Sequence, residues 1–318
     1  MSPISTPQET WRRRAIRAAL RLGFKAPSRW PLPVSWLRAG MEASALLFPL
    51  APGVTRHSGY LGGVPVDTFS PARATGLHIL HLHGGAFFTG SRRTHAGLAS
   101  QLCARAGAHV HLIDYRLAPE HPWPAAPKDV RRVWLALREQ GVAPQRIVVS
   151  GDSAGGALAL GLAQQLKERD EPGPAALLLL SPFLDLGLEA PSVRKLAAAD
   201  PMVTEAALRR GARAYRGQLP SHDPRVSPLW GDLGELPPCL VQVGDDEILL
   251  DDALRFEQMA TRQGSTVVLQ RWPGAWHDFQ LFAHVLPSAA RALDELAHWA
   301  QAHAQAPRRP VLARQRVA

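Results

Sequence analysis

The chain has 318 residues, of which 46% are hydrophobic and 20% are charged, so one large folded domain is expected and a chain disordered throughout is excluded. The net charge of +9 comes from arginines that are spread along the chain, many of them near acidic residues. No basic stripe interleaved with aromatic residues is present, so we expect a solvated, arginine-rich surface and no nucleic-acid partner.

Cysteine use and hydropathy indicate a cytoplasmic protein. Cys103 and Cys239 lie in apolar runs, which predicts two buried free thiols. Arginines interrupt the N-terminal region where a signal peptide needs a continuous apolar stretch. No apolar run reaches the roughly 18 residues that span a bilayer, so no stable membrane anchoring is expected. A homodimer is left open.

Taken in chain order, the elements predict an α/β fold. Residues 10–22 have the spacing of an amphipathic helix, with Trp11, Ile16, Ala19 and Leu20 towards one side. An antiparallel hairpin is expected at 54–60 and 64–69. Nearly continuous apolar runs then predict six buried strands, at 78–82, 109–113, 146–149, 176–180, 239–243 and 266–270. Helical spacing separates them at 94–106, 127–140, 154–168, 251–263 and 287–302. This alternation is typical of a doubly wound, mostly parallel sheet, here with eight strands.

Two segments do not fit the alternation. Both are candidates for a helical cap over the strand ends. The first comprises residues 10–22 and the stretch that follows to about residue 48, and the second comprises residues 186–215. An ordinary docking helix is the alternative for the first. The expected division is a cap segment at 1–45, an α/β core at 46–185 and 216–305, a cap insertion at 186–215 and a basic tail at 306–318.

Residues 151–155 (GDSAG) place Ser153 between a predicted strand and a predicted helix. Glycines must flank a serine in such a sharp turn, because side chains there would clash with neighbouring backbone. The turn exposes the hydroxyl at the sheet's carboxyl edge and points a helix N-terminus at it. The pattern therefore predicts a nucleophilic serine, against the alternative of a structural glycine-rich turn.

Residues 83–88 (HGGAFF) follow the strand at 78–82. Backbone N–H groups of such a loop can stabilise the negative oxygen that forms when a serine attacks an ester, and the amide of Ala154 is the expected further donor. His83 is expected to brace the loop rather than to transfer protons.

A serine nucleophile needs a histidine base and an acid that orients it. His277 lies in the loop directly after the last predicted strand, whereas His284, His298 and His303 lie on or near the C-terminal helix. The acid should lie in the loop after residues 239–243, which reads Gly-Asp245-Asp246-Glu247. We choose Asp246, with Asp245 as the alternative. Asp185 is a weaker candidate, better explained as a loop-bracing aspartate.

At this point the chain resembles the hormone-sensitive-lipase family of α/β-hydrolase esterases. The blocks that carry the resemblance run from about residue 62 to 302: 83–87 (HGGAF), 115–122 (YRLAPEHP), 151–156 (GDSAGG), 223–224 (DP) with 227–229 (SPL), and 246–252 (DEILLDD). The resemblance implies Asp246 as the acid, His277 as the base and an N-terminal cap segment. It also implies an oxyanion site of Gly84, Gly85, Ala86 and Ala154, with Gly84 shaping the turn.

One residue departs from the family pattern. Ala86 stands where the family usually has a third glycine. Because alanine does not readily adopt positive φ, we expect it to donate its N–H only if its φ is negative.

The predicted function is hydrolysis of short- to medium-chain carboxylic esters through an acyl-enzyme, with a small-molecule substrate and no metal or cofactor. The motifs do not separate a simple ester from a lactone, an acetylated compound or an amide. A non-catalytic receptor on the same fold should lack a member of the triad, and a lipid-surface lipase would use the basic N-terminal helix to dock.

Overall fold

The computed structural model of the chain describes residues 7–305. The expected basic tail lies outside these residues, as do the first six positions. Cys103 and Cys239 are buried free thiols, as predicted. Within the described residues, no helix is long and apolar enough to cross a membrane.

The predicted eight-stranded sheet is confirmed. The described strands form one sheet in the order β1-β2-β4-β3-β5-β6-β7-β8. The hairpin pairs antiparallel, as does β2 with β4, and the remaining neighbours are parallel. The bounds are β1 Val54–Leu61, β2 Val64–Pro71, β3 His78–Leu82, β4 His109–Ile113, β5 Ile147–Asp152, β6 Ala176–Leu180, β7 Cys239–Gly244 and β8 Val267–Trp272. Because the parallel strands end at one edge, the loops that follow them meet there.

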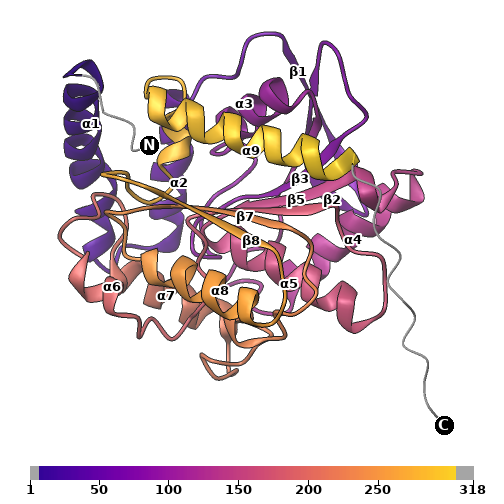
Figure 1. Cartoon of the computed structure of the whole chain (residues 1–318). Coiled ribbons are helices and arrows are strands. Elements are labelled where there is room, and N and C mark those ends of the chain that lie inside the picture. The colour runs from indigo at the N-terminus through magenta and orange to yellow at the C-terminus, as the bar shows by residue number, and fades with distance from the viewer. Residues whose placement is uncertain (1–6, 306–318) are drawn as a thin grey trace.

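Helices cover both faces of the sheet, as a doubly wound fold requires (Figure 1). The apolar core on one face includes α3 (Ala96–Ala106) and α9 (Pro287–Gln305). The core on the other face includes α4 (Ala125–Glu139), α5 (Ala154–Glu168) and α8 (Leu250–Arg262). Short 3-10 turns lie at Pro144–Arg146, Pro228–Trp230 and Phe279–Phe282.

The N-terminal region is helical, but its first helix turns a different face to the protein from the one predicted. Helix α1 (Pro7–Leu20) continues into a π-helical turn at Arg21–Lys25, and a 3-10 turn at Pro27–Arg29 leads to α2 (Val34–Ser44) and a last 3-10 turn at Ala45–Leu47. The predicted apolar side of the first helix is partly wrong, because Leu20 is buried whereas Trp11 is 59% exposed. The reason is that α1 docks through its arginines. Arg13 donates to the carbonyl of Pro273 and Arg17 to the carboxylate of Asp246.

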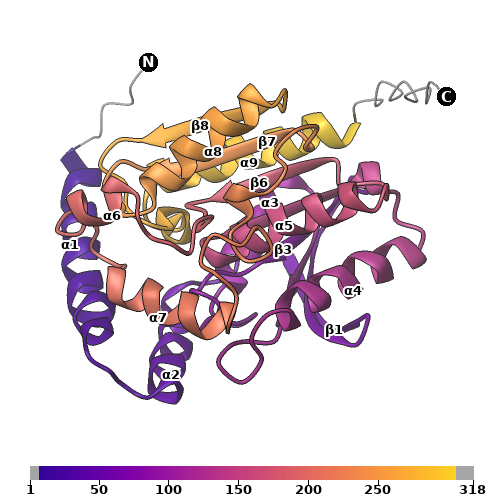
Figure 2. The ribbon, with the colours of Figure 1, turned by 90° about the horizontal axis from the view of Figure 1, so that it is seen from below.

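The two segments expected to form a cap contact each other. The insertion contains α6 (Pro191–Lys195) and α7 (Glu205–Arg216). Lys25 Nζ donates to the carbonyl of Ala197 (2.6 Å), and Arg210 donates to the carbonyl of Leu32 (2.7 Å). Figure 2 shows α7 beside α1 and α2 at one end of the molecule.

Candidate active site

Ser153 occupies a strained turn between β5 and α5, with φ 51° and ψ −118°. The flanking glycines are required sterically. A Cβ on Gly155 would lie 1.8 Å from the carbonyl oxygen of Leu82, and one on Gly151 would lie 2.2 Å from that of Gly155. The turn therefore tolerates no side chain at either neighbour and holds the serine at the N-terminus of α5, as the GDSAG pattern predicts.

Asp152, the residue before the serine, anchors this turn. Its carboxylate is fully buried and lies 3.1 Å from His95 Nε2 and 3.2 Å from His81 Nε2. Burial by itself raises the pKa of Asp152, but His95 and His81 outweigh burial and hold that pKa well below its ordinary range. Asp152 is therefore an ionised brace under the serine.

The loop after β3 supplies candidate oxyanion donors. Gly85 and Ala86 line the same cavity as Ser153. Among the described residues, the backbone N–H groups of Gly85, Ala86 and Ala154 have no acceptor within the protein. A Cβ on Gly84 would lie 2.2 Å from Asp152 Oδ2, which agrees with a turn-shaping role for this glycine.

The expectation for Ala86 is corrected by its backbone. Ala86 has φ 50° and Phe87 has φ 66°, so the alanine adopts the left-handed conformation that we expected it to avoid. The strain is held locally, because Phe87 is buried and its ring stacks on Tyr215 with centroids 3.9 Å apart. The Ala86 N–H has no acceptor among the described residues despite its positive φ, so it is available as a donor.

His83 braces the loop, as expected. It is fully buried, its ring stacks on Tyr115, and the Tyr115 hydroxyl donates to its carbonyl (2.7 Å). Burial, reinforced by His95, lowers the pKa of His83 to about 4. A neutral, enclosed ring of this kind is suited to packing and not to proton transfer.

His277 follows β8 and is 2% exposed, and it lines the cavity together with Ser153. Its Nδ1 lies 3.4 Å from Glu247 Oε1, and its Nε2 lies 3.1 Å from Asp278 Oδ2. No hydrogen bond joins His277 to Ser153 in this structure. Burial lowers the pKa of His277, but Asp278 and Glu247 outweigh it and hold the pKa well above the ordinary value.

The acid at His277 is Glu247, not the predicted Asp246. The Asp246 carboxylate is 34% exposed and pairs with Arg17 (2.8 Å). The alternative, Asp245, pairs with Arg271 (2.9 Å), also near the surface. The physical reason is the backbone: the Asp245 N–H donates to the carbonyl of Trp272 at the end of β8, and the Asp246 N–H donates to that of Ala275 just after it. Glu247 is the first acid beyond that pairing.

Glu247 is fully buried and held on both sides. Its Oε2 accepts from the Ser181 hydroxyl and from the Gly244 N–H, both at 2.8 Å, which leaves Oε1 for His277. Asp185 is distant from this group and braces its own loop, as expected. It accepts from the Gly187 N–H (2.9 Å) and pairs with Arg255 (3.0 Å).

Asp278 is a site residue that the sequence reasoning missed. It is 5% exposed, lines the cavity, and its Oδ1 has no hydrogen-bond partner. Burial raises the pKa of Asp278 to about 7, although His277 beside it acts in the opposite direction. The signal available in the sequence was an acidic residue adjacent to the candidate base.

The cavity has a volume of about 280 Å³ and lies between core and N-terminal region. The core contributes residues of the loop after β3, of the turn at Ser153 and of the loop that holds His277. The N-terminal helices contribute Phe24, Trp36, Leu37 and Met41, and α7 contributes Leu208. The walls are mainly apolar, and the polar groups gather at Ser153.

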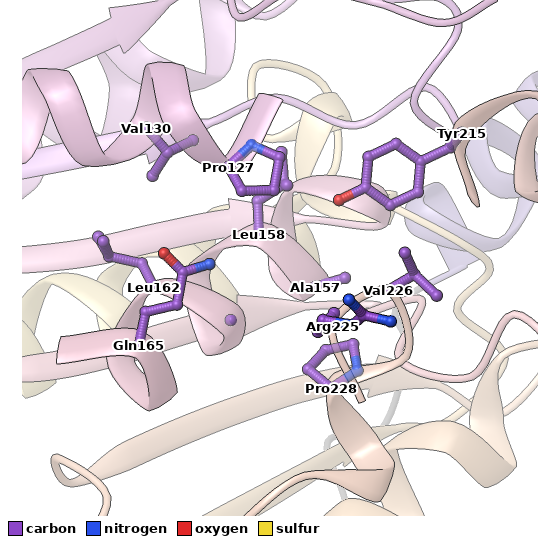
Figure 3. A pocket seen from close by; sticks show the side chains of 11 residues that line it. Pro127, Val130, Ala157, Leu158, Leu162, Gln165, Tyr215, Arg225, Val226 and Pro228 are labelled. Carbon is purple, nitrogen blue, oxygen red and sulfur yellow. The ribbon is translucent and has the colours of Figure 1, made fainter. Parts of the chain in front are cut away.

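A second hollow, between α4, α5 and the segment 215–228, is shown in Figure 3. Pro127, Leu158 and Tyr215 are among its walls, and its volume of about 20 Å³ is space for one water molecule. This hollow is a packing gap and carries no candidate site.

Comparison with known proteins identifies the family. Residues 79–281 match a family described as alpha/beta hydrolase fold. The chain belongs to this family. Its sequence is 39% identical to an esterase of Acinetobacter venetianus over 291 residues, which are 91% of this chain and 96% of that protein. It is also 39% identical to an acetyl-hydrolase of Streptomyces hygroscopicus, over 74% of this chain and 78% of that one.

Solved structures place this α/β hydrolase among relatives of hormone-sensitive lipase. A hormone-sensitive lipase from a metagenome library is 36% identical, with a TM-score of 0.87 over 92% of this chain and 98% of that chain. An esterase from the bacterial hormone-sensitive lipase family is 32% identical, with a TM-score of 0.88 over 95% and 100%. The protein is a carboxylic ester hydrolase resembling bacterial members of this family.

Proposed function

We propose that this α/β hydrolase cleaves short- to medium-chain carboxylic esters through an acyl-enzyme, with Ser153 as nucleophile, His277 as base and Glu247 as acid. The observation that carries the proposal is the meeting of Ser153 and His277 in one cavity, with Glu247 3.4 Å from His277 Nδ1. Glu247 replaces Asp246 in the triad expected from the sequence.

The first half-reaction forms the acyl-enzyme. Ser153 Oγ attacks the ester carbonyl carbon while His277 Nε2 takes the hydroxyl proton. The carbonyl oxygen becomes negative and accepts from the N–H groups of Gly85, Ala86 and Ala154. The intermediate then breaks its bond to the alcohol oxygen, to which His277 returns the proton. Glu247 fixes the tautomer and stabilises the transient imidazolium.

The second half-reaction repeats these roles with water. His277 takes a proton from water as the water oxygen attacks the acyl carbon, and the proton returns to Ser153 Oγ as the carboxylic acid leaves. His277 Nε2 must exchange its contact with Asp278 for one with Ser153 during this cycle. Catalytic hydrogen bonds are often long in free enzymes and tighten when substrate binds, so the free state is compatible with the cycle.

The size of the cavity supports the chain-length part of the proposal. A volume of about 280 Å³ is at the lower end for small-molecule sites, and its walls are closed by the N-terminal helices and α7. The similarity to an acetyl-hydrolase agrees with a short acyl group. The division into a core and a cap of residues 1–45 and 186–215 is part of the same proposal, as is a location in the cytoplasm.

The test is hydrolysis of p-nitrophenyl acetate, butyrate and decanoate by purified wild type, Ser153→Ala and Ser35→Ala. Loss of a triad serine normally lowers kcat by about 10³ to 10⁶, so Ser153→Ala should be inactive. Ser35 is exposed and outside the cavity, and its variant should match wild type. Activity retained in Ser153→Ala would overturn the proposal, and a rate highest on decanoate would overturn the chain-length claim.

A further inference from the structure

Both charged side chains of α2 contact the core, whereas large apolar side chains on α2 and in the 3-10 turn after it are exposed to solvent. Arg38 donates to the carbonyls of Phe88 and Ala118 and pairs with Glu120, and Glu42 accepts from the Ser91 hydroxyl. In contrast, Trp36 is 69% exposed, Leu46 81% and Leu47 66%. An ordinary surface helix has the opposite arrangement.

Most exposed positions of this helix form one stripe. Residues 36, 39, 40 and 43 of α2 are spaced so that they lie on one face, and each is tryptophan, alanine or glycine. The exposed Leu46 and Leu47 follow in the 3-10 turn, and Ser35 is the one exposed polar residue of the helix. The pattern extends to the rest of the N-terminal region. Of the ten large apolar side chains that are exposed among the described residues, seven belong to residues 11–50.

The same region carries most of the chain's excess positive charge. Residues 11–50 contain eight basic residues and one acidic residue, Glu42, which faces inward. Arg14 is exposed on α1, the helix of the exposed Trp11. Arg21 is exposed at the start of the π-helical turn that follows, next to the exposed Leu22. Figures 1 and 2 both place α1 and α2 at one end of the molecule.

This apolar and basic face adjoins the entrance of the active-site cavity. Gly23, Trp36 and Gly40 are exposed and also line that cavity. Whatever binds the face therefore lies at the mouth through which a substrate enters.

We propose that residues 11–50 form a docking face for the surface of an anionic phospholipid bilayer. Exposed tryptophans and leucines insert among the lipid headgroups and upper acyl chains, and the exposed arginines contact lipid phosphates. The charge decides between a membrane and a second copy of the chain. Arg13, Arg17 and Arg38 are paired with Glu9, Asp246 and Glu120, so the charge of the face rests on exposed arginines such as Arg14 and Arg21. A two-fold contact through this face would bring these like charges of the two copies together.

The experiment measures binding of the full chain to sedimented vesicles of phosphatidylcholine alone and of phosphatidylcholine mixed equally with phosphatidylglycerol. We expect binding to the anionic vesicles and weaker binding in 1 M salt, where the screening length falls to about 3 Å. Leu46→Ser/Leu47→Ser should weaken binding at least about tenfold, because two leucines lose their contact with lipid. Arg14→Gln/Arg21→Gln should weaken it by about 25-fold, at about fivefold per arginine.

The matched control is Tyr60→Ser/Val268→Ser, which removes two exposed apolar side chains from β1 and β8 and should bind as wild type. Thermal unfolding of each variant establishes that it is folded. Absence of binding to anionic vesicles, or equal loss in the control, would overturn the proposal. A wild-type dimer that Leu46→Ser/Leu47→Ser converts to a monomer, without vesicle binding, would assign the face to a second copy. Because the readout is binding, it is independent of esterase activity.

Discussion

The Nε2 atom of His277 lies 3.1 Å from the Oδ2 atom of Asp278, the residue that follows it in the chain. Asp278 has φ 53° and ψ 36°, a left-handed conformation that turns its side chain back towards the ring. Glu247 faces the other ring nitrogen at 3.4 Å. The imidazole of the proposed triad therefore has a carboxylate at each nitrogen.

Replacing Asp278 by asparagine should move the acid limb of the pH–rate profile to lower pH. A base works when neutral, and the two carboxylates hold the pKa of His277 above its ordinary value, so activity falls as pH drops through that raised pKa. Removing the charge at Nε2 lowers the pKa, by on the order of one pH unit. The measurement is kcat/KM for p-nitrophenyl acetate against pH. Asp245→Asn is the control, and an unchanged midpoint in Asp278→Asn would show that Asp278 does not control the base.

The two neighbouring acids of the loop after β7 should differ sharply on mutation. Glu247→Gln should lose about 10⁴ in kcat, because the histidine loses the partner that fixes its tautomer. Asp246→Asn should keep most of its activity, since the Asp246 carboxylate contacts Arg17 and not His277. Steady-state kinetics of both variants, with thermal unfolding to establish folding, checks this. Loss of activity in Asp246→Asn alone would restore the acid first expected from the sequence.

Arg17 links α1 to the loop after β7 and to the insertion at 186–215. Its loss should therefore raise KM more than it lowers kcat. It donates to Asp246 Oδ2 (2.8 Å) and to the carbonyl of Ala199 (2.7 Å), and its guanidinium lies over Trp276. Arg17→Gln should lower the free energy of unfolding by about 1–2 kcal/mol and loosen the helix that closes the cavity. Arg14→Gln, an exposed change on the same helix, should leave the kinetics on soluble esters unaltered. Equal kinetics in the two variants would contradict this linkage.

A pair of histidines, His111 buried and His78 half-buried, should make the protein acid-sensitive between about pH 6.5 and 4. His78 Nδ1 lies 2.9 Å from His111 Nε2 across β3 and β4. Burial, with the neighbouring His109, lowers the pKa of His78 to about 4, and burial with His78 and His109 lowers that of His111 to about 3. The unfolded chain binds these protons below about pH 6.5 and the folded chain does not, so stability decreases as pH falls through this window.

The check is thermal unfolding at pH 7 and pH 5 in wild type and in His78→Gln/His111→Gln. The Tm of wild type should drop more between these pH values than that of the double variant, because glutamine keeps a hydrogen-bonding group but takes up no proton. His57→Gln, at an exposed position of β1, is the matched control. If the Tm of the double variant fell as much as that of wild type between pH 7 and pH 5, other groups would cause the acid sensitivity.

Periodicity and steric rules let the sequence alone predict the fold and the strand-to-helix turn that holds Ser153. Continuous apolar runs predict buried parallel strands because both faces of such a sheet are covered, and the runs at 78–82, 109–113 and 176–180 match β3, β4 and β6 to the residue. The turn at Ser153 could also be predicted from the sequence. A Cβ on either flanking glycine would clash with nearby backbone, and this constraint is local to the turn.

Tertiary structure alone decided which carboxylates face His277. Asp245, Asp246 and Glu247 are consecutive acids, and their side-chain types do not reveal where backbone pairing with the end of β8 and the residues after it stops. That pairing leaves the two aspartates near the surface, beside arginines of α1 and β8 that are distant in sequence, and turns Glu247 inward. For the same reason, the sequence could not predict which faces of α1 and α2 contact the protein. Helical spacing reveals that a face is apolar, but the partners of Arg17 and Arg38 decide which face is turned to solvent.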